Sequence, residues 1–387
     1  MTQTAMTDVT IPPLDPPERL LMGPGPSNPD PRVLAAMSRT LVGHLDPYFV
    51  ELMDQAMGAL RYVYRTENHH TLPISATGSG GLEAIMMNLL EPGDGAVVCI
   101  TGYFGQRLAE LARRAGADVR TVEAEPGEIV DVAELDRLLA AKPAKLVAFV
   151  HLETTTGACQ PIAPMVAVAK KHGALVMMDC VTSLGGVPID IDASGVDAAG
   201  SCTQKCLGAP PGLGPITVNA RAMDMVKARK TKPHTWYFDF QLLFQYWGDT
   251  GATKKRAFHH TAPVSSIYGI HEALRLIAEE GLETRWARHQ QGHELLVRGL
   301  DTLGLRLFTP AANRAPTINV ISVPDGLDEA KVRARLLDMG VEMGGGLGAL
   351  AGKVWRVGVM GHNAQPERVD RFVGALGEVL KAEGWVG

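Results

Sequence analysis

The sequence predicts an α/β fold in which a mainly parallel sheet is flanked by helices and followed by a smaller α+β domain. Three apolar runs, at 95–100, 144–153 and 174–180, are continuous rather than alternating, which is typical of parallel strands buried on both faces. Stretches with apolar residues three and four positions apart separate these runs, as crossover helices do. Beyond about residue 260 long, charged helices replace this rhythm, which indicates the second domain.

The order of the elements supports this division. An amphipathic helix is predicted from about residue 48, and residues 71–90 are predicted to form a strand, a glycine turn and a helix. The remaining expected elements are strands at 195–204, 214–220, 316–323 and 354–359 and helices at 264–281, 283–304, 329–340 and 366–384. We therefore expect an N-terminal arm over residues 1–20, a large domain over 21–262 and a small C-terminal domain over 263–387.

The composition excludes several classes of protein. The 387 residues are 46% hydrophobic and 20% charged, unlike a disordered chain. The net charge of −5 argues against a dedicated binder of nucleic acid or anionic membranes, because those partners select strong positive patches. No apolar run is long enough for a membrane helix, and the first residues lack the pattern of a signal peptide. With five cysteines, an odd number that favours free thiols, the sequence predicts a cytoplasmic protein.

Three features along the predicted sheet carry chemistry. Lys205 lies at the end of a strand among small and apolar residues, where burial would lower the pKa of its amine, as a Schiff-base lysine requires. Asp179 ends an apolar strand, which is where open α/β sheets bind ligands. The turn 76–81 enters a helix and would hold a phosphate on its free N–H groups.

Each feature also has a plainer interpretation. Lys205 could point into water, and Asp179 could cap the helix that follows it. The glycine turn has neither the GK[ST] of a P-loop nor the GxGxxG spacing. Their combination is more informative, because pyridoxal phosphate (PLP) needs a phosphate site, a carboxylate for its pyridine nitrogen and a lysine for its aldehyde.

The chain resembles the class V aminotransferases of PLP fold type I, and within them the alanine/serine–glyoxylate aminotransferase family. The resemblance spans about residues 20–380. Its strongest parts are LLMGPGPSN (20–28), SATGSGGLEA (75–84), MMDCVTSLGG (177–186), SCTQKCLGAPPG (201–212), RKTKPHTWYFD (229–239), FHHTAP (258–263) and MGGGLGALAGKVWRVGVMGHNA (343–364). It implies a mainly parallel seven-stranded sheet in the large domain and a homodimer with shared active sites.

The resemblance also implies the cofactor residues. Lys205 matches the lysine that forms the Schiff base with PLP, and Asp179 matches the acid that keeps the pyridine nitrogen protonated. Phe104 matches an aromatic residue that stacks on the ring, where animal members usually carry Trp. Thr154 matches a Ser or Thr beside the ring, although its hydroxyl could equally satisfy a local turn. The residues that match phosphate ligands are Thr77, Gly78, Ser79 and Gln204 and, donated across the dimer, Thr261.

On the substrate side, Arg356 matches the residue whose planar guanidinium grips the α-carboxylate, next to the loop of Gly345 and Gly346. The GPGPSN segment, which includes Gly25, is expected to bring backbone close to the substrate side chain. His44 is a candidate for donor selection, or else an exposed loop histidine.

Some residues depart from the family pattern or mimic other sites. Phe258 replaces a Tyr that often reaches the phosphate in this family, so this contact is in doubt. The adjacent His259 and His260 lack a partner carboxylate motif, and the sequence predicts no metal site. Cys202 and Cys206 flank Lys205 at a spacing that does not match zinc ligands.

The resemblance implies ping-pong transamination from alanine or serine to glyoxylate, with Lys205 as the proton-transfer base. A specialised donor, namely ureidoglycine, aminoethylphosphonate or pyridoxamine, is the alternative, with pyruvate or glyoxylate as acceptor. A cysteine desulfurase is disfavoured because all five cysteines precede residue 207, whereas that enzyme needs a mobile cysteine in its C-terminal domain. A binding protein that has lost turnover is disfavoured by the presence of Lys205, Asp179 and Arg356.

Overall fold

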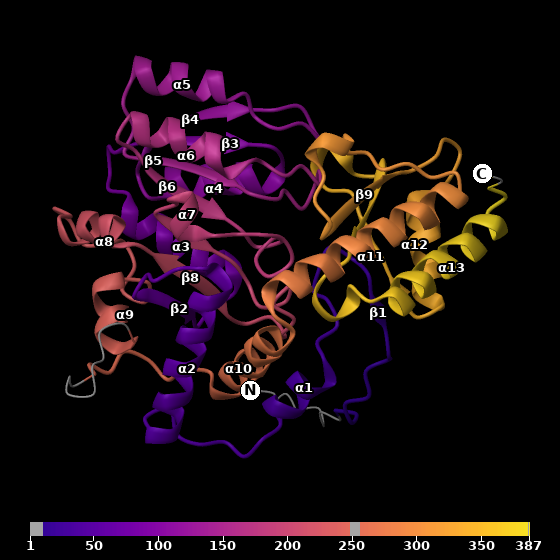
Figure 1. Ribbon diagram of the computed structural model, residues 1–387, viewed down its shortest axis with the longest axis horizontal. Coiled ribbons are helices and arrows are strands. Elements are labelled where there is room, and N and C mark those ends of the chain that lie inside the picture. Colours follow the sequence, from indigo (N-terminus) through magenta and orange to yellow (C-terminus); the bar gives the residue numbers. More distant parts are fainter. Residues whose placement is uncertain (1–10, 248–255, 386) are drawn as a thin grey trace, which may run out of the picture.

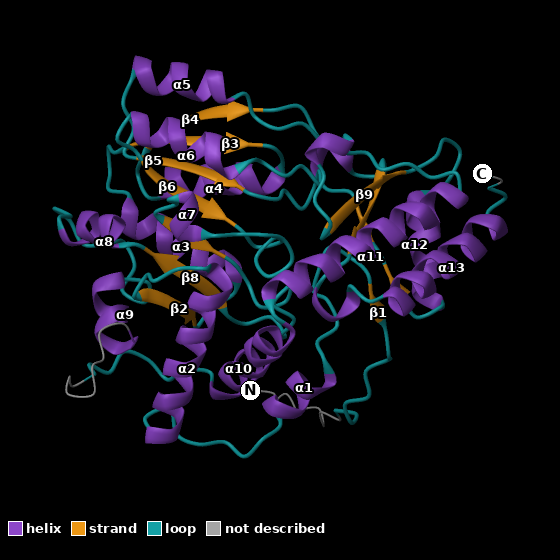
Figure 2. Ribbon diagram, in the orientation of Figure 1, coloured by secondary structure: helices purple, strands orange, loops and turns teal. Residues whose placement is uncertain are grey.

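The computed structural model describes residues 11–247, 256–385 and 387, and it is built around a large sheet. In these residues the sheet has seven strands in the order β2-β8-β7-β6-β5-β3-β4. Strand β8 (Gly214–Val218) is antiparallel to both neighbours, and the other six strands share one direction. Helices flank the sheet, as Figure 2 shows. The α/β class with a mainly parallel sheet is therefore confirmed.

The central strands are short and fully buried, as their continuous apolar sequences predict. Every residue of β5 (Leu146–Val150) and β6 (Leu175–Asp179) is buried, because helices cover the sheet. The other strands of this sheet are β2 (His70–Ile74), β3 (Gly95–Ile100), β4 (Asp118–Glu123) and β7 (Ala198–Gly200). The sequence analysis missed β4, because this edge strand keeps polar residues partly exposed and has no apolar run.

Several helices of the first part of the chain begin at residues whose side chains cap them. Helix α2, for example, begins with Pro47 directly after Asp46, whose side chain accepts a hydrogen bond from the backbone of Tyr48. The helices of the first part of the chain are α1 (Pro31–Met37), α2 (Pro47–Tyr64), α3 (Gly78–Leu89), α4 (Tyr103–Arg114), α5 (Val132–Ala141), α6 (Ile162–Lys171), α7 (Ile191–Ser194), α8 (Ala220–Lys227), α9 (Phe240–Trp247) and α10 (Val264–Glu280).

The C-terminal part has its own sheet and core. Strands β9 (Ile318–Ser322), β12 (Val354–Gly358) and β11 (Gly344–Gly345) form an antiparallel sheet in the order β11-β12-β9. Its helices are α11 (Leu282–Thr302), α12 (Glu329–Asp338) and α13 (Pro366–Ala382). Figure 1 shows these elements gathered beside the large sheet, with α11 running between the two parts.

The N-terminal segment joins this C-terminal part. Strand β1 (Leu20–Leu21) pairs in parallel with β10 (Val341–Glu342), and Leu20 and Met22 lie in the same apolar cluster as Trp355 and Phe372. The start of the predicted arm, residues 1–10, lies outside the described residues. The predicted domain limits stay a prediction, although α10 packs against α1 and α2 and shares the core of the large sheet.

Across the ranges that the structure describes, we find no helix with the length and apolar character needed to cross a membrane.

Candidate active site

Side chains that the sequence singles out follow the carboxyl ends of five strands that run in one direction. Because these ends meet at one edge of the sheet, the residues that follow them come together there. They line a cavity of about 200 Å³. Of the predicted residues, those that line it are Thr77 and its neighbours Gly78 and Ser79 after β2, Phe104 after β3, Thr154 after β5, Asp179 at the end of β6, and Gln204 and Lys205 after β7.

Lys205 lies in this cavity on a tight turn that its neighbours hold in place. The backbone N–H of Ser27 donates to the carbonyl of Gln204 at 2.9 Å, and the Ser27 hydroxyl donates to the Lys205 carbonyl at 3.1 Å. The Lys205 ammonium donates to the carbonyl of Pro24. Burial lowers the pKa of Lys205, with a further lowering from the charge of Arg356. The amine is thereby biased toward its neutral, nucleophilic form.

Gly25 is required where the chain passes over this lysine. Its φ of +113° lies in a region that favours glycine, and a Cβ built on it would overlap the Lys205 side chain. The backbone of residues 24 and 25 therefore lies against the Lys205 side chain, and the expected approach of this segment to the substrate stays a prediction.

Asp179 presents a buried carboxyl to the cavity. Its side chain is 3% exposed, and Oδ1 accepts a hydrogen bond from the backbone N–H of Val181 at 2.9 Å. Burial raises the pKa of Asp179 to about 7, and the charges of Arg107 and Lys205 counteract this only in part. A protonated ring nitrogen beside this carboxyl would supply the missing counter-charge.

The N-terminus of α3 forms the predicted anion cradle. Thr77 caps the helix without a side-chain hydrogen bond, so its first N–H groups remain available to a ligand. Gly78 allows close packing, because a Cβ there would lie 2.6 Å from Cβ of Cys202. The Ser79 hydroxyl accepts a hydrogen bond from Arg107 at 2.7 Å.

Two residues that shape the surroundings of the cavity escaped the sequence analysis. Glu153 is fully buried, and its carboxylate accepts hydrogen bonds from the backbone N–H groups of Phe104 and Gly105 at 3.0 and 3.2 Å, which fixes the start of α4. Arg107 lines the cavity with its guanidinium 4.6 Å from the ring centroid of Phe104. The sequence signal for Arg107 is its position in GYFGQR, three residues after Phe104, which places both side chains on one face of the helix.

Arg356 lies at the border of the same site, on β12. Its Nε donates to the carbonyl of Gly345 at 2.7 Å, and Nη1 lies 3.5 Å from the carbonyl of Thr154, a residue of the cavity wall. It is 7% exposed, and burial lowers the pKa of Arg356. The loop of Gly345 thus orients a guanidinium that acts electrostatically on Lys205.

The family model described as aminotransferase class-V matches residues 20–372. This chain belongs to the class V aminotransferase family.

Related proteins and structures agree with this assignment. The alanine–glyoxylate aminotransferase of Mus musculus is 41% identical over 371 residues, which cover 95% of this chain and 89% of the relative. The (S)-ureidoglycine–glyoxylate transaminase of Bacillus subtilis is 37% identical over 383 residues, covering 94% and 91%. The crystal structure of an alanine–glyoxylate aminotransferase from Nostoc sp. superposes with a TM-score of 0.94 at 47% identity, covering 98% of this chain and all of that one.

The cofactor of a class V aminotransferase is PLP, and the residues of this cavity fit it. The Gln204 side chain lines the cavity, and its amide N–H₂ group is a donor of the kind that a phosphate oxygen accepts from, while the buried Asp179 carboxyl suits a cationic partner. The first N–H groups of α3 suit the phosphate. We propose that Thr77, Gly78, Ser79 and Gln204 hold the phosphate, that Phe104 and Thr154 flank the ring, and that Asp179 and Lys205 bind its nitrogen and aldehyde.

Two predicted residues of this aminotransferase lie elsewhere. His44 and Thr261 line a separate, open pocket of about 360 Å³. Thr261 is exposed, and the imidazole of His44 lies 5.8 Å from the ring of Phe258, which is itself 63% exposed. Within one chain these residues do not join the Lys205 cavity.

The histidine pair and the cysteines have local roles. Nδ1 of His259 lies 2.8 Å from Nδ1 of His260, and the His259 ring stacks on Trp236 at 4.4 Å. Among the described residues, no three His, Cys, Asp or Glu side chains are grouped as metal ligands would be. Burial raises the pKa of both Cys202 and Cys206 to about 12. Neither thiol therefore has the low pKa of a reactive nucleophile.

The buried carboxyl of Asp179 predicts a pH effect in the protein freed of PLP. A raised pKa means that the fold favours the neutral acid, so this stabilisation is complete below about pH 4 and is lost as the pH rises through about 7. Asp179→Asn cannot ionise. Between pH 4 and pH 8, its free energy of unfolding should rise relative to that of the parent by up to about 4 kcal/mol. Urea titrations of both cofactor-free proteins measure this difference, and a difference that is constant with pH would contradict the prediction.

Proposed function

We propose that this class V aminotransferase transfers the amino group of alanine or serine to glyoxylate by a ping-pong mechanism. One observation carries the proposal: a buried lysine of lowered pKa and a buried arginine, Lys205 and Arg356, flank the cavity that fits PLP. Relatives named alanine–glyoxylate aminotransferase support the choice of substrates.

The walls of the site favour a small substrate. The backbone at Pro24 and Gly25 contacts Lys205 so closely that a Cβ on Gly25 has no space. The Gly345 carbonyl and the Thr154 backbone hold Arg356. A substrate whose α-carboxylate binds Arg356 while its amine meets Lys205 has little room for a long side chain.

The residues have distinct tasks in this proposal. PLP supplies an aldehyde that captures the amine and a ring that accepts the electrons of the bond broken at Cα. Arg356 binds the α-carboxylate through N–H groups at the edge of its planar guanidinium, and so orients the Cα–H bond. Lys205 would move the proton from Cα of the donor to the carbon that carried the aldehyde, and in the second half-reaction it would move a proton in the opposite direction, to Cα of the product amino acid. Asp179 supplies the negative charge that holds a proton on the ring nitrogen.

A panel of amino donors tests the proposal. Steady-state rates would be measured for alanine, serine, ureidoglycine, aminoethylphosphonate and pyridoxamine, each with glyoxylate and with pyruvate. The highest kcat/KM is expected for alanine or serine with glyoxylate. If neither amino acid is used, the substrate assignment fails, and release of sulfide from cysteine would point to a desulfurase instead.

The second candidate is an enzyme of the same family with a specialised donor, ureidoglycine, aminoethylphosphonate or pyridoxamine. The 37% identity to an (S)-ureidoglycine–glyoxylate transaminase favours the first of these. His44 and Phe258, whose rings lie 5.8 Å apart, are where we expect such a shift.

We also propose a homodimer in which Thr261 and His44 complete the site of the partner. Both lie near large apolar side chains that a monomer would expose to water. These are Leu41, Leu45, Tyr48, Trp236 and Phe258, with exposed fractions of 67%, 60%, 61%, 63% and 63%. The five free cysteines are compatible with a reducing compartment, and we propose the cytoplasm.

Mixed dimers test the shared site. Thr261→Ala should weaken PLP binding about tenfold, because a hydrogen bond to a charged group is lost. When Thr261→Ala chains are mixed with Lys205→Ala chains, each mixed dimer regains one intact site, so activity should return at the PLP affinity of the parent. A fully active monomer in sedimentation, or mixing without any recovery, would contradict the proposal.

A further inference from the structure

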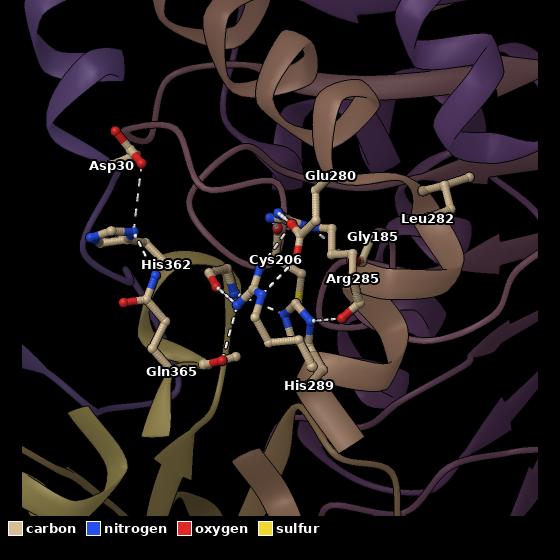
Figure 3. Close-up of polar contacts among 12 residues, drawn as sticks. Asp30, Gly185, Cys206, Glu280, Leu282, Arg285, His289, His362 and Gln365 are labelled. Atoms are coloured by element: carbon tan, nitrogen blue, oxygen red, sulfur yellow. Dashed lines mark hydrogen bonds and ion pairs between the residues drawn. The ribbon is translucent and has the colours of Figure 1, made fainter. Parts of the chain in front are cut away.

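A network of charged side chains joins the turn of Lys205 to the turn that follows the strand of Arg356. Its members are Glu280, the last residue of α10, and Arg285, Arg288 and His289 on the first turns of α11. The spacing of three and four residues places these α11 side chains on one face of the helix. Figure 3 shows the contacts around them, and we refer to the four residues as the Glu280 network.

On one side the network holds the lysine turn. Arg285 is 6% exposed and donates to the carbonyl of Cys206, the residue after Lys205, at 2.6 Å. It also donates to the Gly185 carbonyl at 3.1 Å and to the Glu280 carboxylate at 2.7 Å. The guanidinium therefore fixes the backbone directly beside Lys205.

On the other side the network holds the turn of residues 361–364. Nη1 of Arg288 donates to the carbonyls of Gly361 and Ala364 at 2.8 and 3.0 Å. Nε2 of His289 accepts from the N–H of Gly361 at 2.9 Å. Burial lowers the pKa of His289 to about 3, so the ring is neutral and Nδ1–H donates to the Arg285 carbonyl at 2.8 Å. This turn begins three residues after β12, the strand of Arg356.

Glu280 couples the two halves. Its carboxylate accepts from Arg285 and also from Nε and Nη2 of Arg288, at 2.6 and 3.0 Å. Removing one of these partners would leave a charge that is only partly compensated in a partly buried site.

Hydrogen bonds add to packing at this turn, whose Ala364 belongs to the apolar core of the C-terminal part. A cavity of about 310 Å³ borders Glu280, Arg285, Arg288 and His362. On its other side the turn contacts the lysine loop, since a Cβ on Gly361 would lie 3.3 Å from the Lys205 carbonyl. The bonds of Arg288 and His289 thus hold the turn against that loop, together with the bond that Asn363 donates to the Leu21 carbonyl.

We propose that the Glu280 network is a positioning device that, through Arg288, sets Arg356 relative to Lys205 and thereby tunes binding of the substrate carboxylate more than binding of the cofactor. The inference rests on the proposed function, in which Arg356 binds that carboxylate. The fold gives the reason why binding of the substrate should change more than binding of PLP. The described residues that line the PLP cavity all lie between Thr77 and Lys205, whereas residues 361–364 continue the strand of Arg356.

The test compares Arg288→Gln with Arg298→Gln, which changes an exposed arginine on the same helix. In Arg288→Gln holoenzyme, the KM values for amino donor and 2-oxo acid should rise about tenfold, as expected for coupling through positioning residues. The PLP dissociation constant, measured by titration of the cofactor-free protein, should stay within about twofold of the parent. Arg298→Gln should change neither quantity.

Two further variants sharpen the result. Arg288→Lys keeps the charge opposite Glu280 but loses the paired donors, so its KM should be intermediate, and it serves if Arg288→Gln does not fold. In an Arg356→Gln background, Arg288→Gln should change the KM by less than about twofold, because the residue through which it acts is already gone.

The outcomes separate the inference from the proposed function. If Arg356→Gln itself leaves the KM unchanged, the proposed carboxylate site fails. If Arg356→Gln raises the KM but Arg288→Gln and Arg288→Lys do not, only the network inference fails. It fails equally if Arg288→Gln weakens PLP binding as much as substrate binding, or if its effect persists in the Arg356→Gln background.

Discussion

Replacing Lys205 with alanine should reduce transamination by at least about a thousandfold and abolish the visible absorbance band of lysine-bound PLP that borohydride fixes. The amine of Lys205 is buried, has a lowered pKa and lines the cavity with Asp179 and the α3 N-terminus. We see no other lysine among the described residues that line this cavity, so no second amine can replace it there. Absorbance spectra and single-turnover rates of the reconstituted variant measure both effects.

The matched control is Lys353→Ala, which removes an exposed lysine from the C-terminal part. Its spectrum and rate should equal those of the parent. Normal turnover by Lys205→Ala would show that another group is the base. Loss of the band with normal turnover would separate cofactor attachment from proton transfer and would also refute the assignment.

Arg356→Gln should have the second largest effect, a rise of about a hundredfold in the KM for both the amino acid and the 2-oxo acid. A charge-assisted, paired hydrogen bond to a carboxylate is among the strongest that a side chain makes. Binding of PLP should change little, because Arg356 does not line the cofactor cavity. Arg356→Lys should be intermediate, since an ammonium keeps the charge but not the planar pair of donors.

An exposed arginine, Arg306, provides the control for Arg356, and Arg306→Gln should leave the KM unchanged. Thermal unfolding of each variant distinguishes substrate binding from structure, because Arg356 also donates to the Gly345 carbonyl. If Arg356→Gln lowers the melting temperature but leaves the KM as in the parent, the residue is structural and does not bind substrate.

The sequence anticipated which residues gather in one cavity where a short segment contains the whole signal. Asp179 ends a continuous apolar strand, and Lys205 follows another strand in a glycine- and proline-rich turn. Because same-direction strands end at one edge of a sheet, the order of such segments along the chain places their last residues together. Eight predicted residues accordingly line one cavity.

Residues whose role depends on distant backbone were missed. Glu153 resembles any strand-end glutamate until its carboxylate is found on the N–H groups of residues 104 and 105, some fifty positions away. The pairing of Leu20–Leu21 with Val341–Glu342 likewise joins opposite ends of the chain. No local periodicity encodes such contacts, because they form only when separate elements pack.

The sequence by itself determined the α/β class, the mainly parallel sheet, the family motifs and the residue types that PLP chemistry needs, because apolar runs, glycine turns and caps act over a few neighbouring residues. Only the tertiary structure decided the electrostatic state of these residues. Burial raises the pKa of Asp179 to about 7 and lowers that of Lys205. The tertiary structure also decided that Thr261 and Lys205 lie apart within one chain. It likewise decided that Arg285 and Arg288 connect the turn of Lys205 with the turn that follows the strand of Arg356. Desolvation and hydrogen bonding depend on what surrounds a side chain in three dimensions, and packing alone sets those surroundings.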